Sequence, residues 1–305
     1  MPHFFDYYAP YRPLLDSGQF RYCIENALLL LDGVRQLAPP QYQAAHKGTP
    51  FYVMGYAAFA SHDYPTASLF FDAAVAEDLQ NYPGRLDSPA ILFMELSDNM
   101  PNGTPVLGTE IVTQIKADVD ILIADYNTRT GARQVTLDEL RTFFLRPIIR
   151  SGQPHKRTLV TALISFIAEW RYRAKLINLF EQGSREPFFL HLLRGCVLFE
   201  SLLKEQTKKA LTQDTLGRIL QHDLLAELGI ANVQVGADNF NNDVVAGLGP
   251  NMTMEATINS TAQARNTLGH NLVWMVADLN AGTYDLLMKN IASACLHAIS
   301  KLYRP

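Results

Sequence analysis

The sequence predicts an all-α protein made of two helical domains. Apolar residues recur at spacings of three and four along most of the chain, whereas alternating, strand-like runs bounded by turn residues are scarce. A length of 305 residues exceeds what one hydrophobic core usually fills, which favours two domains. With 48% hydrophobic and 18% charged residues, the chain can build such cores.

Charge and cysteine content exclude several classes of protein. A net charge of −4 argues against a protein that binds polyanions through a global excess of Lys and Arg. Cys23, Cys196 and Cys295 have no metal-ligand or Cys-x-x-Cys spacing, so we expect reduced core thiols. The start, MPHFFDYYAP, lacks the basic residues of a signal peptide, and no apolar stretch reaches the length of a membrane helix. We therefore expect a cytoplasmic protein with no membrane segment, metal or other cofactor.

The N-terminal half contains a predicted helix over about residues 15–37, which ends before Pro39, and then a predicted helical hairpin over residues 50–80. The residues that define the hairpin pattern are Phe51, Met54, Gly55, Ala67, Phe71 and Ala74. They stand at the spacings of a tetratricopeptide repeat, and the segment resembles one such helix pair. A second copy is not apparent, so an ordinary hairpin inside a larger helical domain is the alternative.

Two more helices follow. Thr136 and, three residues later, Glu139 form a capping-box signature, and Pro147 is expected to interrupt the helix that they begin. A long helix then runs from Lys156 to Gln182, before a glycine at the position of a C-terminal cap, Gly183.

We therefore predict a domain boundary after residue 182. Residues 1–182 are expected to form a tetratricopeptide-like domain that senses or binds a partner, and residues 183–305 a bundle of four or five helices. Within this bundle an amphipathic helix covers residues 188–209. The segment Gly229–Asn251 is rich in Asn and Gly and has little periodicity, so we expect a mobile lid or a loop that contacts a partner.

One segment of the second domain carries candidate chemistry. Arg265, Asn266 and His270 read Arg-Asn-x-x-x-His, and this pattern resembles the motif of HEPN domains, in which an arginine precedes a histidine by a few residues. The stretch from Arg194 to Lys204 also resembles the opening helix of many HEPN proteins, including a glutamate, Glu200, that faces the motif. The resemblance covers about residues 186–305.

The resemblance implies a metal-independent RNA endonuclease, in a toxin or antiviral defence setting, whose site is shared by two copies of the domain. The residue types suit that chemistry. An RNA strand can be cut by its own 2′-hydroxyl if His270 moves the proton and Arg265 stabilises the charge on the phosphate. Asn266 would orient these groups or contact RNA, with Glu200 and Arg194 in support and Lys204 and Lys208 on the RNA backbone.

Other arginine–histidine pairs fit similar spacings. Arg150 to His155 contains a glycine and a proline and predicts a loop, and Arg185 to His191 fits only a looser form. His297, beside apolar residues on the last helix, is interpreted as a packed side chain.

Two alternatives compete with the ribonuclease. One is a non-catalytic scaffold built on a degenerate HEPN bundle, and the other is a helical adaptor with no role in nucleic-acid binding, which the slightly acidic charge favours. Leu272 stands where one toxin branch of the HEPN family has a tyrosine, which argues against that branch.

Overall fold

The structure is a computed structural model that describes residues 11–131, 135–180, 183–207, 215–237, 239–270 and 279–304. Regular structure in these residues is helical, and the one extended pairing among them is an isolated bridge between Asn99 and Pro105. The all-α class predicted from the sequence is confirmed. Among the described helices, none combines the length and the hydrophobicity of a membrane-spanning segment.

Two compact units interleave along the chain. Unit 1 contains the described residues up to Ile115, together with Leu145–Ser165. Unit 2 contains Lys116–Phe144 and the described residues from Phe166 onward. The chain therefore passes between the units three times, inside the long helices α7 (Thr109–Thr130) and α10 (Pro154–Leu179) and at the end of the π-helical turn η2 (Arg141–Leu145).

This division differs from the predicted boundary at residue 182. The second half of α10 packs with helices that follow it in the sequence. The ring of Phe166 stacks on that of His191 with centroids 4.8 Å apart, and the Trp170 indole N–H donates to Asp285 at 3.0 Å. Because α10 carries apolar side chains along its whole length, this one helix contributes to the cores of both units. The predicted boundary, placed before Gly183, instead assigned the whole helix to the first domain.

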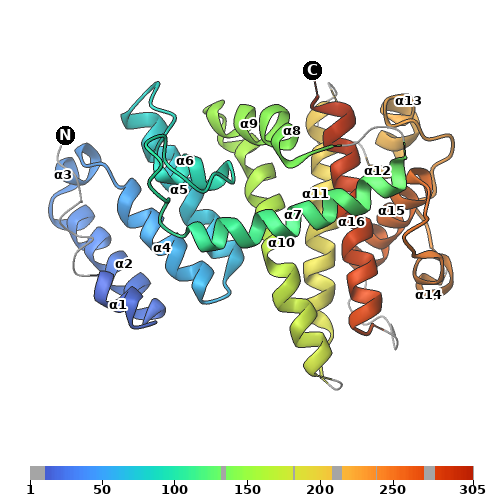
Figure 1. Ribbon diagram of the computed structural model, residues 1–305, viewed down its shortest axis with the longest axis horizontal. Coiled ribbons are helices and arrows are strands. Elements are labelled where there is room, and N and C mark those ends of the chain that lie inside the picture. Colours follow the sequence, from blue (N-terminus) through green and yellow to red (C-terminus); the bar gives the residue numbers. More distant parts are fainter. Residues whose placement is uncertain are drawn as a thin grey trace. The chain divides into compact units, whose positions relative to one another are not determined.

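Unit 1 combines short helices with two helices of 18 residues, α2 (Phe20–Leu37) and α5 (Tyr64–Asn81) (Figure 1). Apart from these two and its parts of α7 and α10, its helices are α1 (Arg12–Asp16), α3 (Pro39–Ala44), α4 (Gly48–Ala60), α6 (Pro89–Met94) and α9 (Arg146–Arg150). The predicted hairpin is present as α4 and α5. A Cβ on Gly55 would lie 2.8 Å from the ring of Phe71, so the glycine allows the two helices to approach closely.

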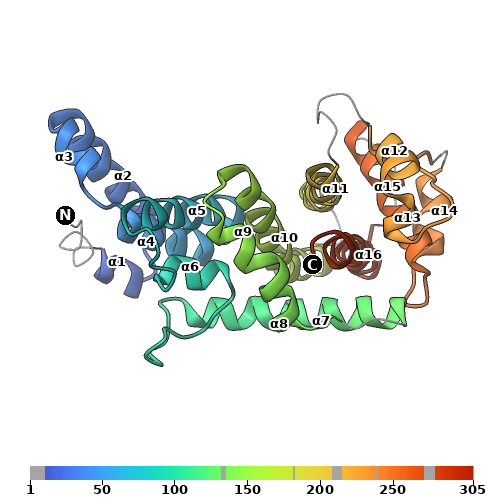
Figure 2. The same ribbon diagram turned by 90° about the horizontal axis from the view of Figure 1, so that it is seen from above.

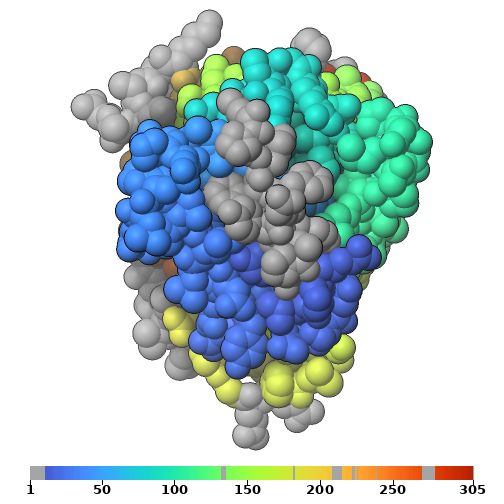
Figure 3. Space-filling model, turned by 90° about the vertical axis from the view of Figure 1, so that its left-hand side faces the viewer, coloured from blue at the N-terminus to red at the C-terminus, as the bar shows by residue number. Residues whose placement is uncertain are grey.

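The first helices of unit 1 are amphipathic. On α2, Cys23, Ala27 and Leu31 are buried, as the spacing predicts. The same helix exposes Leu28, Leu29 and, at its C-terminal end, Leu37. The surface of the first helices is the dark blue part of Figure 3. The structure thus places large apolar side chains on the outside of unit 1.

Unit 2 has three long helices at its centre. Its shorter elements are α8 (Leu137–Leu140), most of the π-helical turn η2 (Arg141–Leu145), α12 (Leu216–Arg218), η3 (Ile219–Asp223), α13 (Leu225–Leu228), α14 (Phe240–Asp243) and η4 (Val245–Gly247). The long helices α11 (Glu186–Gln206), α15 (Met254–His270) and α16 (Ala281–Leu302) pack on one another. Figure 2 shows α11 and α16 end-on and side by side.

The capping box predicted at Thr136 and Glu139 is present in both directions. The prediction that Pro147 interrupts the helix is wrong. The π-helical turn η2 ends directly before α9, and Pro147 is in the first turn of α9, where a missing backbone N–H costs little.

Candidate functional site

The structure brings Arg265 of α15 onto Glu200 of α11. The Arg265 Nε donates to Glu200 Oε2 at 2.6 Å, and the Lys204 ammonium contacts the other carboxylate oxygen, also at 2.6 Å. Glu200 is 5% exposed, whereas about 30% of the Arg265 side chain is exposed. The two segments that resemble a HEPN domain therefore meet through a charge-assisted hydrogen bond.

Arg194 forms an ion pair with a residue of another helix. Its guanidinium donates to Glu169 of α10 at 2.5 Å, and Arg173 contacts the same carboxylate at 2.6 Å. Burial by itself would raise the pKa of the Glu169 carboxyl, but the positive groups around it bring the pKa below its ordinary value. The Arg194–Glu169 ion pair is a structural contact that the motif does not predict, since Arg194 and Glu200 are six residues apart and lie on different sides of α11.

Asn266 faces the segment after α13. Its amide nitrogen donates to the carbonyl of Val235 at 2.7 Å, and its amide oxygen lies 3.5 Å from a guanidinium nitrogen of Arg265. Through the first contact, Asn266 holds the backbone of this segment at Val235, a role that the motif does not indicate.

Asn266 is one of a row of side chains on α15 that bind residues 231–236, a segment we call the strap. The contacts join Glu255 to the N–H of Ala231, Asn259 to the N–H of Gln234 and the carbonyl of Asn232, Gln263 to the carbonyl of Gly236, and Asn266 to the carbonyl of Val235. Donor–acceptor distances run from 2.7 to 3.1 Å. The strap lies within the predicted lid, Gly229–Asn251, and its backbone is hydrogen-bonded to α15, which does not fit a mobile lid.

A groove of about 1130 Å³ lies beside the strap. Asp243 and Glu255 line it, and no Lys or Arg is among the described residues that do so. This groove therefore lacks the positive charge that an RNA backbone needs.

His270 is the last residue of α15, five positions after Arg265, which corresponds to a rise of about 7.5 Å along the helix. Its side chain, the residues that follow it up to 278, and Lys208 lie outside the described part of the chain. The described half of the candidate site thus consists of Arg265, Glu200 and Lys204. In the part of the chain that the structure describes, no three His, Cys, Asp or Glu side chains form a group that could hold a metal ion.

The competing arginine–histidine pairs have structural roles. Arg150 binds Glu95 through two nitrogens at 2.5 and 2.7 Å. His191 is fully buried: its Nε2 donates to the carbonyl of Phe166 at 2.8 Å, and its Nδ1 accepts from the Tyr284 hydroxyl at 2.7 Å. Burial lowers the pKa of His191 to about 4, so the ring is neutral at pH 7.

Two smaller predictions about buried groups are confirmed. His297 is 4% exposed, its Nε2 donates to the carbonyl of Leu228 at 2.8 Å, and burial lowers its pKa. Cys23, Cys196 and Cys295 are buried and unpaired with one another.

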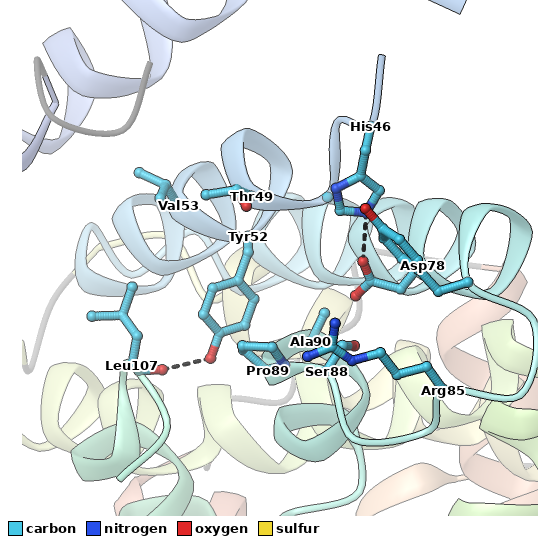
Figure 4. Close-up of a pocket in the computed structure, with 12 residues that line it drawn as sticks. His46, Thr49, Tyr52, Val53, Asp78, Arg85, Ser88, Pro89, Ala90 and Leu107 are labelled. Carbon is cyan, nitrogen blue, oxygen red and sulfur yellow. Dashed lines mark hydrogen bonds and ion pairs between the residues drawn. The ribbon is translucent and has the colours of Figure 1, made fainter. Parts of the chain in front are cut away.

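A cavity in unit 1 was missed by reasoning from the sequence. His46 and Asp78, both 6% exposed, lie 2.7 Å apart in its wall (Figure 4). The two residues are 32 positions apart and belong to no motif, so the sequence offers no signal that pairs them.

No protein-family model, curated protein or solved structure matches the chain.

Proposed function

We propose that this chain is a metal-independent ribonuclease of the HEPN type that cuts RNA with Arg265 and His270. The observation that carries the proposal is the 2.6 Å contact between Arg265 and Glu200, because it joins the two segments on which the resemblance depends. The contact fixes the guanidinium at one nitrogen while part of the side chain is exposed to solvent, where it can meet a phosphate.

In this proposal the RNA supplies the nucleophile. His270 moves the proton of the 2′-hydroxyl, Arg265 stabilises the charge that develops on the phosphate, Glu200 positions Arg265, and Lys204 and Lys208 attract the RNA backbone. Two copies of the second domain would complete one site, so the proposal includes a homodimer through that domain. A protein partner at the N-terminal helices and a toxin or antiviral defence setting belong to the proposal at the level of family resemblance.

The test is cleavage of labelled single-stranded RNA by the purified protein in the presence of a chelator. We expect products with 2′,3′-cyclic phosphate ends and no cleavage of DNA, because DNA lacks the hydroxyl. His270→Ala and Arg265→Ala should each lower the rate by about a hundredfold or more.

Arg150→Ala is the matched control. Like Arg265, Arg150 is about one-third exposed and binds a buried glutamate, so its loss should lower the melting temperature comparably while cleavage continues. Cleavage by His270→Ala at the parent rate, or a requirement for a divalent metal, would contradict the proposal.

A non-catalytic scaffold is the second candidate function, and the roles of Asn266 and Arg265 within the fold favour it. Asn266 holds the strap and Arg265 is already paired with Glu200, so both residues have a use that requires no RNA. A scaffold predicts that Arg265→Ala and Asn266→Ala lower stability in a protein that neither binds nor cuts RNA.

A further inference from the structure

Unit 1 contains a cavity of about 350 Å³, which is at the small end of the range for ligand pockets. Residues of α4, α5 and α6 and of the segments beside them line it. Its apolar wall includes Val53, Ala90, Leu107 and the ring of Tyr52. The Tyr52 hydroxyl donates to the carbonyl of Leu107 at 2.5 Å, so this polar group is bonded within the wall. The cavity thus offers apolar surface to a small molecule.

A buried polar pair forms one end of the cavity. His46 Nε2 and Asp78 Oδ1 are 2.7 Å apart, and both side chains are more than nine-tenths buried. Gly48 lies against this pair: a Cβ there would be 2.7 Å from the Asp78 carboxylate and 2.7 Å from the His46 ring. Only a glycine leaves room for the pair, so the backbone itself is fitted to it.

The cavity also carries a cation. Figure 4 shows the Arg85 guanidinium reaching below Asp78, toward Ser88 and Pro89. Its carboxylate partner, Asp87, at 3.1 Å, is not among the residues that line the cavity, whereas Asp78 has His46 beside it in the wall. The bond to Asp87 uses the Arg85 Nε, so the two terminal nitrogens of the guanidinium are the cationic donors of the lining that can meet an anion.

We propose that this cavity binds a small organic monocarboxylate with an apolar body. The apolar part contacts Tyr52, Val53 and Leu107, and Arg85 donates to the carboxylate through its planar pair of nitrogens. The proposal is independent of the ribonuclease proposal, since it concerns unit 1 alone.

Calorimetric titration of the full chain with octanoate tests the proposal, with 1-octanol and octylamine as neutral and cationic counterparts of equal chain length. We expect saturable, one-to-one binding of octanoate, about tenfold weaker binding of 1-octanol, and weaker binding still of octylamine. Saturating octanoate should also raise the melting temperature.

Two pairs of variants locate the site. Arg85→Gln should weaken octanoate about tenfold and leave 1-octanol unchanged, whereas Arg21→Gln, at another exposed arginine paired with a carboxylate, should change neither. Thr49→Phe, in the first turn of α4 and in the cavity lining, should abolish binding by filling the cavity, whereas Thr66→Phe, in the first turn of α5, should not.

Three outcomes would overturn the proposal: no saturable binding of octanoate, tighter binding of octylamine than of octanoate, or unchanged binding in a folded Thr49→Phe protein. Circular dichroism and melting temperature show whether each variant is folded.

Discussion

His46 in unit 1 and His191 in unit 2 are both buried, but their surroundings differ. His191 is held on its two nitrogens by uncharged groups, a carbonyl and a hydroxyl, inside a packed core. His46 contacts a carboxylate and lines a cavity. A histidine of the first kind stabilises the fold, whereas one of the second kind is placed to meet a ligand. Burial of a titratable residue therefore does not by itself identify a site, and an adjoining cavity does more to distinguish the two roles.

The same contrast holds for the polar side chains near the Arg265 motif. The amides of Asn259, Gln263 and Asn266 all bind the backbone of the strap, so their polarity is used inside unit 2. In unit 1 two polar residues of the cavity wall, His46 and Asp78, bind each other instead. Three predictions sharpen this difference.

The largest expected effect comes from the pH dependence of stability through His191. In the unfolded chain the imidazole binds a proton near pH 6.5, whereas burial lowers its pKa in the folded state to about 4. The folded state therefore loses stability as pH falls from about 6.5 towards 4, and the loss from this group reaches about 3 kcal/mol, at about 1.4 kcal/mol for each pH unit.

The measurement is the free energy of unfolding by urea between pH 7 and pH 4.5 for the parent and for His191→Gln, whose amide can still donate to the carbonyl of Phe166. The variant should be less stable at pH 7 but should lose less stability on acidification. His297 is present in both proteins, so its contribution to the pH dependence cancels when the two losses of stability are compared. Equal losses in the two proteins would show that His191 is not the structural histidine described above.

The second prediction compares two glycines. A Cβ on Gly195 would lie 2.4 Å from the Phe166 ring and 2.8 Å from Ile291, and both side chains are fully buried. Gly195→Ala should therefore lower the free energy of unfolding by about 1–3 kcal/mol, because a packed core cannot move aside easily. Gly48→Ala should lower the free energy of unfolding by less, because the His46–Asp78 pair can shift into the cavity. The same variant should weaken octanoate binding.

Urea unfolding and calorimetry of both variants check this pair of outcomes. A Gly48→Ala protein as destabilised as Gly195→Ala would mean that the wall of the cavity is as rigid as the core of unit 2.

The smallest effect is expected at the strap. Asn259→Ala removes the hydrogen-bond partners of the Gln234 N–H and the Asn232 carbonyl, so it should lower the free energy of unfolding by about 1 kcal/mol. Amide hydrogen exchange should show Gln234 protected in the parent and faster to exchange in the variant. Rapid exchange of Gln234 in the parent would instead restore the mobile lid predicted from the sequence.

Several helices could be predicted from the sequence because they depend on local patterns, although α7 was not among them. The stripe of Leu192, Cys196, Phe199 and Leu203 on α11 is buried as its spacing predicts, and the capping box at Thr136 follows from two residues three apart. The close approach of α4 and α5 was also predictable, because Gly55 is a local signal for helix contact.

The candidate site could be predicted only in part. Glu200 and Arg265 were paired through a resemblance and do lie in contact, yet Arg194 binds Glu169, and Asn266 holds the strap. Which carboxylate an arginine meets depends on the rotation of each helix about its axis, and no motif of a few residues records that rotation.

The helical class, the ends of several helices and the position of the Arg-Asn-x-x-x-His motif follow from the sequence, because each depends on residues within a few turns of one another. The tertiary structure alone decided that α10 serves two cores, that the strap is bound to α15, and that His46 meets Asp78 beside a cavity. These three features depend on contacts between residues far apart in the chain, whose geometry is set by the packing of whole helices rather than by local preference.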